Sequence, residues 1–198
     1  MHPHKAFEIM TYVIGGTVEH RDSLGTLQTV SAGGAQVMQA GSGIYHGEAF
    51  RGGSAEGLQI WFEPHLSEAV KHPATYNQYD HEQFPTKAQE GTSLKTVIGE
   101  GSPVHIQTEA RMYDIQLDPG AKYSYPLSEG ALVAFLAIRG SGEAVTGNDA
   151  AVPIAHKDFA VAKADASGES LSLTAGEEGL RVVAIELPEK PGYPLYRK

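Results

Sequence analysis

Histidine and carboxylate residues form two short pairs near the start of the chain. His2 and His4 are separated by one residue, and so are His46 and Glu48. On a β-strand, residues two positions apart point to the same face of the sheet. If the two strands face each other, three imidazoles and one carboxylate converge. Such a donor set suits a divalent transition metal that keeps coordination positions open for a substrate.

The spacing leaves two interpretations open. In one, these four residues bind a metal; in the other, His2 and His4 are frayed terminal residues and His46 is a buried, hydrogen-bonded histidine. The identity of the carboxylate ligand is also open. The spacing of His2, His4 and Glu8 resembles the first motif of the cupin superfamily, in which the glutamate is a ligand. Glu8 and Glu48 therefore compete for that position, and the other one could orient a ligand histidine.

Short apolar segments between glycine-rich turns predict the strands that position these residues. Residues 7–14 are aromatic and β-branched, and residues 17–21 alternate apolar with polar side chains, with Gly15-Gly16 as a predicted turn between them. His20 lies on the alternating segment and is interpreted as a surface residue. Together with further segments, these predict a small antiparallel barrel; the further segments are 26–30, 35–40, 44–48 and 58–63.

A more polar segment separates this set of strands from a second one. Residues 64–91 carry scattered prolines and histidines and are predicted to be an irregular connector with one helical turn near 67–71. Strands resume from residue 92 and include the apolar segment 131–138. We therefore predict an all-β chain of two antiparallel β-barrels. The expected domains are a first barrel with the metal site at 1–63, the connector at 64–91 and a second barrel without metal at 92–198.

A weak internal repeat relates the two halves. His2 and His4 align with Tyr125 and Leu127, on either side of a proline, and each pair precedes a strand and a glycine-rich turn, the second at 140–142. Tyr125 and Leu127 are not usual ligands of divalent ions. The repeat therefore predicts two barrels of one kind, with a metal only in the first.

Composition excludes several classes of protein. The 198 residues are 41% hydrophobic, which is enough for a packed core, and the absence of cysteine excludes disulfides and thiolate metal sites. A net charge of −9 disfavours direct binding of nucleic acid. The sequence has neither an apolar segment of membrane-spanning length nor a signal-peptide pattern. We expect no membrane partner and a cytoplasmic location.

Longer stretches of sequence carry a family resemblance. HPHKAFEIMTYVIGGTVEHRDSLG and MQAGSGIYHGE are similar to the two metal-binding stretches of the pirin family, which are bicupins. LQIWFE, GSPVHIQTEARMYDIQLDPG and RVVAIELP are similar as well, and the short C-terminal ending resembles bacterial quercetinase-type members. The chain departs from the family pattern at Gly47, where serine is usual, and at Ala6. It also lacks the several dozen residues that normally precede HPH, so the first jelly-roll barrel is expected to lack its opening strands.

The resemblance implies a site and a function. It implies that His2, His4, His46 and Glu48 hold one divalent transition metal, which decides the carboxylate in favour of Glu48; iron is implied first, with manganese, nickel, cobalt, copper and zinc as alternatives. It implies a ring-cleaving dioxygenase of the quercetin 2,3-dioxygenase type, with a flavonol-like substrate and Glu48 as general base. The alternative is a non-catalytic, metal-dependent binding or regulatory protein that acts through protein contacts. Apolar pocket walls are expected from Phe7, Met10, Tyr12, Met38, Ile60 and Phe62.

Two further expectations concern occupancy of the metal site. Missing opening strands would leave an unpaired sheet edge, which a second copy of the chain could cover as a homodimer. His2 would then fray, so the metal would be bound below one equivalent and His2 would contribute less than His46. Protons should displace the metal from ordinary histidines between roughly pH 6 and 5.

Overall fold

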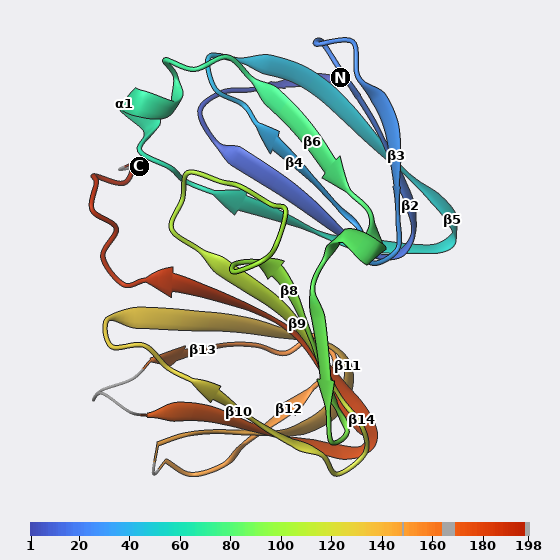
Figure 1. The fold of residues 1–198 in the computed structure, drawn as a ribbon, viewed down its shortest axis with the longest axis vertical. Helices are drawn as coiled ribbons and strands as arrows, with labels where there is room; N and C mark the ends of the chain where they lie inside the picture. Colours follow the sequence, from blue (N-terminus) through green and yellow to red (C-terminus); the bar gives the residue numbers. More distant parts are fainter. Residues whose placement is uncertain (148, 164–168, 197–198) are drawn as a thin grey trace. The chain divides into compact units, whose positions relative to one another are not determined.

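The structure of the chain is a computed structural model that describes residues 1–147, 149–163 and 169–196. It is built from antiparallel strands and divides into two compact units (Figure 1). The expectation of an all-β chain with two barrels is confirmed. Among the described residues, no helix has the length and apolar character needed to cross a membrane. The first unit comprises Met1–Phe84, Pro103–Thr108 and Gly192–Lys198, and the second comprises Pro85–Ser102 and Glu109–Pro191.

The first unit, called here the first barrel, is organised around two long paired strands. These are β2 (Glu8–Asp22) and β5 (Ile44–Phe62), and the short strand β1 (His2–His4) pairs with β5 on its other side. The strand order is β1-β5-β2-β4-β6, with β3 paired to β2. The remaining strands are β3 (Leu27–Ser31), β4 (Ala35–Gln39) and β6 (Thr75–Tyr79).

At two glycine-rich positions where the sequence predicts a turn, the structure has a bend within a continuous strand. β2 runs through Gly15-Gly16, and its register with β5 shifts between Val13 and Gly15 and again before Thr17. Gly16 has φ +70°, and a Cβ on it would lie 2.7 Å from a backbone oxygen of β5. Glycine therefore permits a bulge that bends the strand without ending it. The predicted turn here is wrong, as is the one at 140–142, where β11 also continues through a register shift.

Regular structure also extends into residues 64–91, for which the sequence predicts an irregular connector. The helical turn expected near 67–71 is present as α1 (Leu66–Ala69). The rest of 64–91 is less irregular than predicted, because β6 pairs with β4, and β7 (Thr86–Gln89) pairs with β8 (Thr92–Ile98). The β6 segment, TYNQY, combines a β-branched residue with two tyrosines, which favour strands. Its polar neighbours conceal that preference. A short 3-10 turn, η1 (His81–Gln83), lies between β6 and β7.

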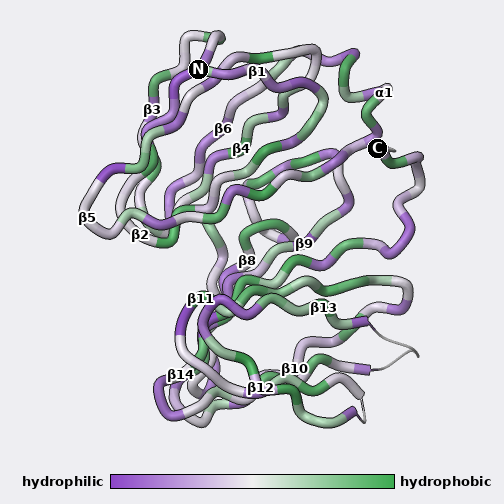
Figure 2. Tube along the Cα trace, turned by 180° about the vertical axis from the view of Figure 1, so that it is seen from behind, coloured by the Kyte–Doolittle hydropathy of each residue, from purple (hydrophilic) through white to green (hydrophobic). Residues whose placement is uncertain are grey.

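The second unit, the second barrel, has a similar arrangement of long and short strands. Its order is β12-β11-β14-β9-β8-β7, with β10 paired to β14 and β13 to β11. β10 pairs with β14 much as β1 pairs with β5, which agrees with the internal repeat. β1 (HPH) is hydrophilic (Figure 2). Besides β7 and β8, its strands are β9 (Arg111–Leu117), β10 (Lys122–Pro126), β11 (Ala131–Thr146), β12 (Val152–Ala155), β13 (Phe159–Lys163) and β14 (Ser170–Pro188).

The bulge at Gly16 gives a test of the fold. We expect Gly16→Ala to lower the free energy of unfolding by about 2–4 kcal/mol, because alanine adds backbone strain and a steric clash. Gly25→Ala is the matched control, since Gly25 also has positive φ (93°) but has open space around a Cβ, so only about 1–2 kcal/mol should be lost. Urea unfolding followed by the fluorescence of Trp61, the sole tryptophan, reports on the first barrel. Equal losses in both variants would mean that the strand can shift to accept the side chain.

Candidate metal centre

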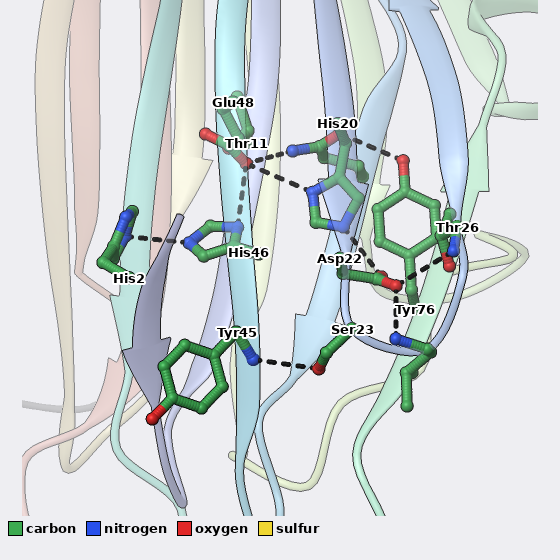
Figure 3. A network of polar contacts seen from close by, with 12 residues as sticks. His2, Thr11, His20, Asp22, Ser23, Thr26, Tyr45, His46, Glu48 and Tyr76 are labelled. Carbon is green, nitrogen blue, oxygen red and sulfur yellow. Dashed lines mark hydrogen bonds and ion pairs between the residues drawn. The ribbon is translucent and has the colours of Figure 1, made fainter.

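The β1–β5 ladder brings the three predicted histidine ligands together. His2 lies opposite His46, and His4 lies opposite Ile44. The Nε2 atoms of His2 and His46 are 3.1 Å apart (Figure 3). The three ring centroids are separated by 4.5, 4.6 and 4.8 Å, and one nitrogen from each ring lies within 4.8 Å of the others. The three imidazoles therefore form a compact triangle.

This triangle fits a divalent transition-metal ion. Metal–nitrogen bonds of about 2.0–2.1 Å hold two adjacent ligand nitrogens roughly 2.9–3.4 Å apart, which matches the spacing between His2 and His46. Zinc, copper, iron and nickel all accept imidazole ligands, so the donors fit a class of metals and do not select one. His46 is only 1% exposed, His4 is half-buried and His2 is exposed. The triangle is thus open to solvent on the side of His2.

Glu48 lies beside His46, on the side away from His2. Its Oε1 atom is 4.0 Å from Nδ1 of His46, the ring nitrogen that faces away from His2 (Figure 3). The carboxylate accepts hydrogen bonds from Thr11 Oγ1 (3.2 Å), Gln59 Nε2 (3.0 Å) and Gln36 Nε2. One carboxylate oxygen of Glu48 lies within 4.8 Å of a nitrogen of His20 and of His46, and the three residues form a set separate from that of His2, His4 and His46. The structure therefore assembles the three histidines directly and places Glu48 behind His46.

Burial and nearby charges keep His46 and Glu48, both on β5, in the protonation states that metal ligands require. Burial lowers the pKa of His46 to about 4, helped by the neighbouring histidines and opposed by Glu48. Burial would raise the pKa of Glu48, but the nearby His20 and His46 and the hydrogen bond from Thr11 outweigh it and lower that pKa. At neutral pH, His46 is accordingly neutral and Glu48 is ionised.

His20 belongs to this network, although its flanking charged residues suggest a surface position. Its side chain is 0% exposed, so the surface interpretation is wrong. In the register of β2 with β5, His20 lies opposite Glu48 and Asp22 opposite His46. The signal was in the sequence: His20 and Asp22 have the same two-residue spacing as His46 and Glu48. Two such pairs on adjacent antiparallel strands gather their four side chains on one face.

Glu8, the competing carboxylate, has a structural role. It is 1% exposed and accepts hydrogen bonds from Gln39 Nε2 (2.6 Å) and the backbone nitrogens of Gln107 (2.6 Å) and Thr108 (2.9 Å). The hydroxyl of Thr108 donates another, at 2.9 Å. These bonds tie the segment Pro103–Thr108 to β2. Its oxygens are committed to this segment, which favours Glu48 as the carboxylate at the centre.

An aromatic side chain that was not predicted from the sequence, that of Trp61, lies beside the centre. Trp61 is 49% exposed, and its ring centroid lies 4.8 Å from that of His4 and 5.7 Å from that of Phe7. Its Nε1 donates to Gln59 Oε1 at 3.0 Å, and Gln59 in turn donates to Glu48. By contrast, four expected pocket-wall residues are almost fully buried in the barrel, namely Met10, Tyr12, Met38 and Phe62.

The second barrel presents different chemistry at the repeated positions. Tyr125 and Leu127 are each 5% exposed and pack in its apolar core. The Tyr125 hydroxyl donates to Glu186 Oε2 at 2.5 Å. Among the described residues, the groups of side chains that could hold a metal lie in the first barrel. A second barrel without metal stays a prediction.

The sequence is similar to those of several known proteins. The family model described as Pirin matches residues 1–62. Pirin-like protein 2 from Arabidopsis thaliana is 32% identical over 189 residues, which is 93% of this chain and 59% of that protein. The chain spans about half the length of the curated relatives it matches.

Two solved structures show the same fold at low sequence identity. Quercetin 2,3-dioxygenase from Acinetobacter baumannii is 26% identical and aligns with a TM-score of 0.81, covering 98% of this chain and 70% of that one. The bacterial pirin YhhW from Escherichia coli, solved in complex with nickel(II), is 27% identical and aligns with a TM-score of 0.72, covering 96% and 76%.

The burial gradient across the triangle predicts unequal contributions to metal affinity. We expect His46→Ala to weaken binding of Zn(II) at least tenfold more than His2→Ala does. The side chain of His46 is buried on the long strand β5, whereas His2 must be ordered from a solvent-exposed three-residue strand. Competition titration against a chromophoric chelator measures both. Equal losses would show that β1 is as rigid as β5.

The lowered pKa of His46 predicts a pH dependence for the metal-free protein. Between about pH 6.5 and 4 the unfolded chain binds a proton at this residue that the folded chain does not, so stability falls as pH drops through that window. Protons therefore compete for His46 only near pH 4, below the range of 6 to 5 expected for an ordinary histidine. Urea unfolding of wild-type and His46→Asn proteins at pH 7, 5.5 and 4.5 isolates the effect. The variant should lose less stability on acidification, and parallel losses would contradict the assignment.

Proposed function

The chain belongs to the pirin family, and from that premise we propose that it is a metal-dependent, ring-cleaving dioxygenase of the quercetin 2,3-dioxygenase type. The observation that carries the proposal is the triangle of His2, His4 and His46, with an ionised Glu48 behind it and an exposed aromatic ring beside it. Three neutral donors and one carboxylate leave positions on a bound metal open to substrate.

The proposed ligand set is His2, His4 and His46, completed by Glu48. The spacing of the histidine nitrogens supports the first three, and the position of Glu48 on the same face of β5 as His46 supports the fourth. Iron is our first choice of metal, because dioxygen chemistry suits a redox-active ion bound by histidines and a carboxylate and open to solvent. The nickel bound to the related Escherichia coli pirin supports a centre that binds a divalent transition metal.

The proposed substrate is a flat aromatic molecule that bears an enol-type hydroxyl, such as a flavonol. Trp61 supports this choice, because half of its surface is exposed within a few ångströms of the His4 ring. Aromatic rings of ligands gain from offset or edge-on contact with such a side chain. The hydrogen bond from Nε1 to Gln59 limits rotation of the indole, so the platform is held in place.

When bound, the metal would supply Lewis acidity that favours the deprotonated hydroxyl of the substrate and its reaction with dioxygen. The protein would supply the base: Glu48 accepts the hydroxyl proton. Its carboxylate is kept charged and in place by Thr11, Gln36 and Gln59. His46 remains neutral because it is buried, so one ring nitrogen stays available as a ligand.

Reconstitution tests the function. The metal-free protein is loaded anaerobically with Fe(II), and uptake is followed by quenching of the Trp61 fluorescence, since the sole tryptophan lies next to His4. Oxygen consumption is then measured with quercetin. Wild type should take up iron and consume oxygen, His46→Ala should do neither, and Glu48→Gln should lower kcat by about 10²–10⁴-fold.

The control is His156→Ala, which removes an exposed histidine of the second barrel and should behave as wild type. Iron uptake without oxygen consumption would overturn the dioxygenase and favour the alternative, a metal-dependent binding or regulatory protein. Failure to take up any divalent metal would overturn both.

A further inference from the structure

His20 takes no part in the proposed chemistry, yet it is fully buried against the two β5 residues that do. It is 0% exposed, and its ring stacks on Tyr76 with centroids 4.1 Å apart and planes inclined by 22° (Figure 3). Nδ1 of His20 lies 3.9 Å from Glu48 Oε1. The Tyr76 hydroxyl donates to Gln36 Oε1 at 3.1 Å, and Gln36 also donates to Glu48. Two routes of contact therefore join His20 to Glu48.

Asp22 fixes the other side of the His20 ring. Its Oδ1 accepts hydrogen bonds from the backbone nitrogens of Leu24 (2.9 Å) and Thr26 (3.0 Å), which makes the carboxylate part of the turn after β2. Its Oδ2 is 2.9 Å from Nε2 of His20. The carboxylate only accepts, so the hydrogen of His20 is assigned to Nε2. In the neutral imidazole, Nδ1 then presents a lone pair toward the metal centre.

The facing nitrogens of His20 and His46 are complementary. Nδ1 of each is buried without a hydrogen-bond partner among the described residues. The two atoms lie 3.9 Å (His20) and 4.0 Å (His46) from Glu48 Oε1, and the two ring centroids are 5.4 Å apart. When His46 binds a metal through Nε2, its Nδ1 carries the hydrogen. His46 then offers a donor where His20 offers an acceptor. Partners that hold the far nitrogen of a ligand histidine fix the orientation of its ring.

We infer that His20, anchored by Asp22, is a positioning residue that orients His46 so that Nε2 of His46 faces His2 and His4. This inference rests on the proposed metal site. The competing explanation is that His20 only fills space in the barrel core. The two differ in what they require at position 20: positioning requires a polar atom where Nδ1 lies, whereas space filling requires only volume.

Two substitutions at position 20 separate these explanations. His20→Asn keeps a polar group near the place of Nδ1, and His20→Leu keeps similar volume without one. His156→Ala is again the control. Affinity for Zn(II) alone is measured by competition titration, with thermal unfolding to verify that each variant is folded. We expect His20→Leu to bind Zn(II) about 10–100-fold more weakly than wild type, and His20→Asn to recover most of that loss.

A second readout needs no metal. Nitrogen-15 NMR of the metal-free protein reports which ring nitrogen of His46 carries the hydrogen. Wild type should show it on Nδ1, and His20→Leu should show a mixture of both tautomers. A merely structural role would leave this signal unchanged.

The outcomes are distinguishable. Equal Zn(II) affinities for wild type and a folded His20→Leu protein, or equal losses for leucine and asparagine, would overturn the inference and leave the metal site intact. A wild-type protein that binds no divalent metal would overturn the proposed function, and this inference with it.

Discussion

The register between β1 and β5 is the constraint on which the rest of the centre depends. β1 has three residues, and His2 must lie opposite His46 for the imidazoles to converge. A slip of one residue would turn both β1 histidines to the opposite face of the sheet. The short strand gains little from its own backbone hydrogen bonds, so the long strand β5 sets the geometry.

Around Glu48, the interior of the first barrel is polar where an ordinary core would be apolar. Thr11, Gln36, His20 and His46 are almost fully buried around the Glu48 carboxylate. Buried polar groups are costly unless they are hydrogen-bonded, and here the side-chain hydrogen bonds converge on Glu48. The second barrel instead places Tyr125 and Leu127 in an apolar core at the repeated positions. The same strand plan thus supports a buried polar cluster in one barrel and an apolar core at the repeated positions of the other.

Much of the centre was predictable, because a strand repeats every two residues. His2 with His4 and His46 with Glu48 follow that period, and the structure brings the three histidines together with Glu48 behind them. His20 was missed because charged neighbours on a polar strand conceal its inward direction, although its spacing to Asp22 repeats the pattern.

The parts that could not be predicted depend on contacts between distant segments. A glycine pair signals a bend, but only the register with a partner strand decides between a turn and a bulge, as at Gly16. The role of Glu8 depends on a segment about a hundred positions away, near Thr108. The place of Trp61 depends on the fold of β5 against β1. A local sequence pattern contains no information about such contacts between distant segments.

The central claim is that β1 and β5 together form a metal site, and anomalous diffraction from crystals loaded with nickel(II) or zinc(II) tests it most directly. We predict one dominant anomalous peak within bonding distance, about 2.0–2.2 Å, of a nitrogen from each of His2, His4 and His46. A dominant peak elsewhere in the protein, or none within reach of His46, would contradict it.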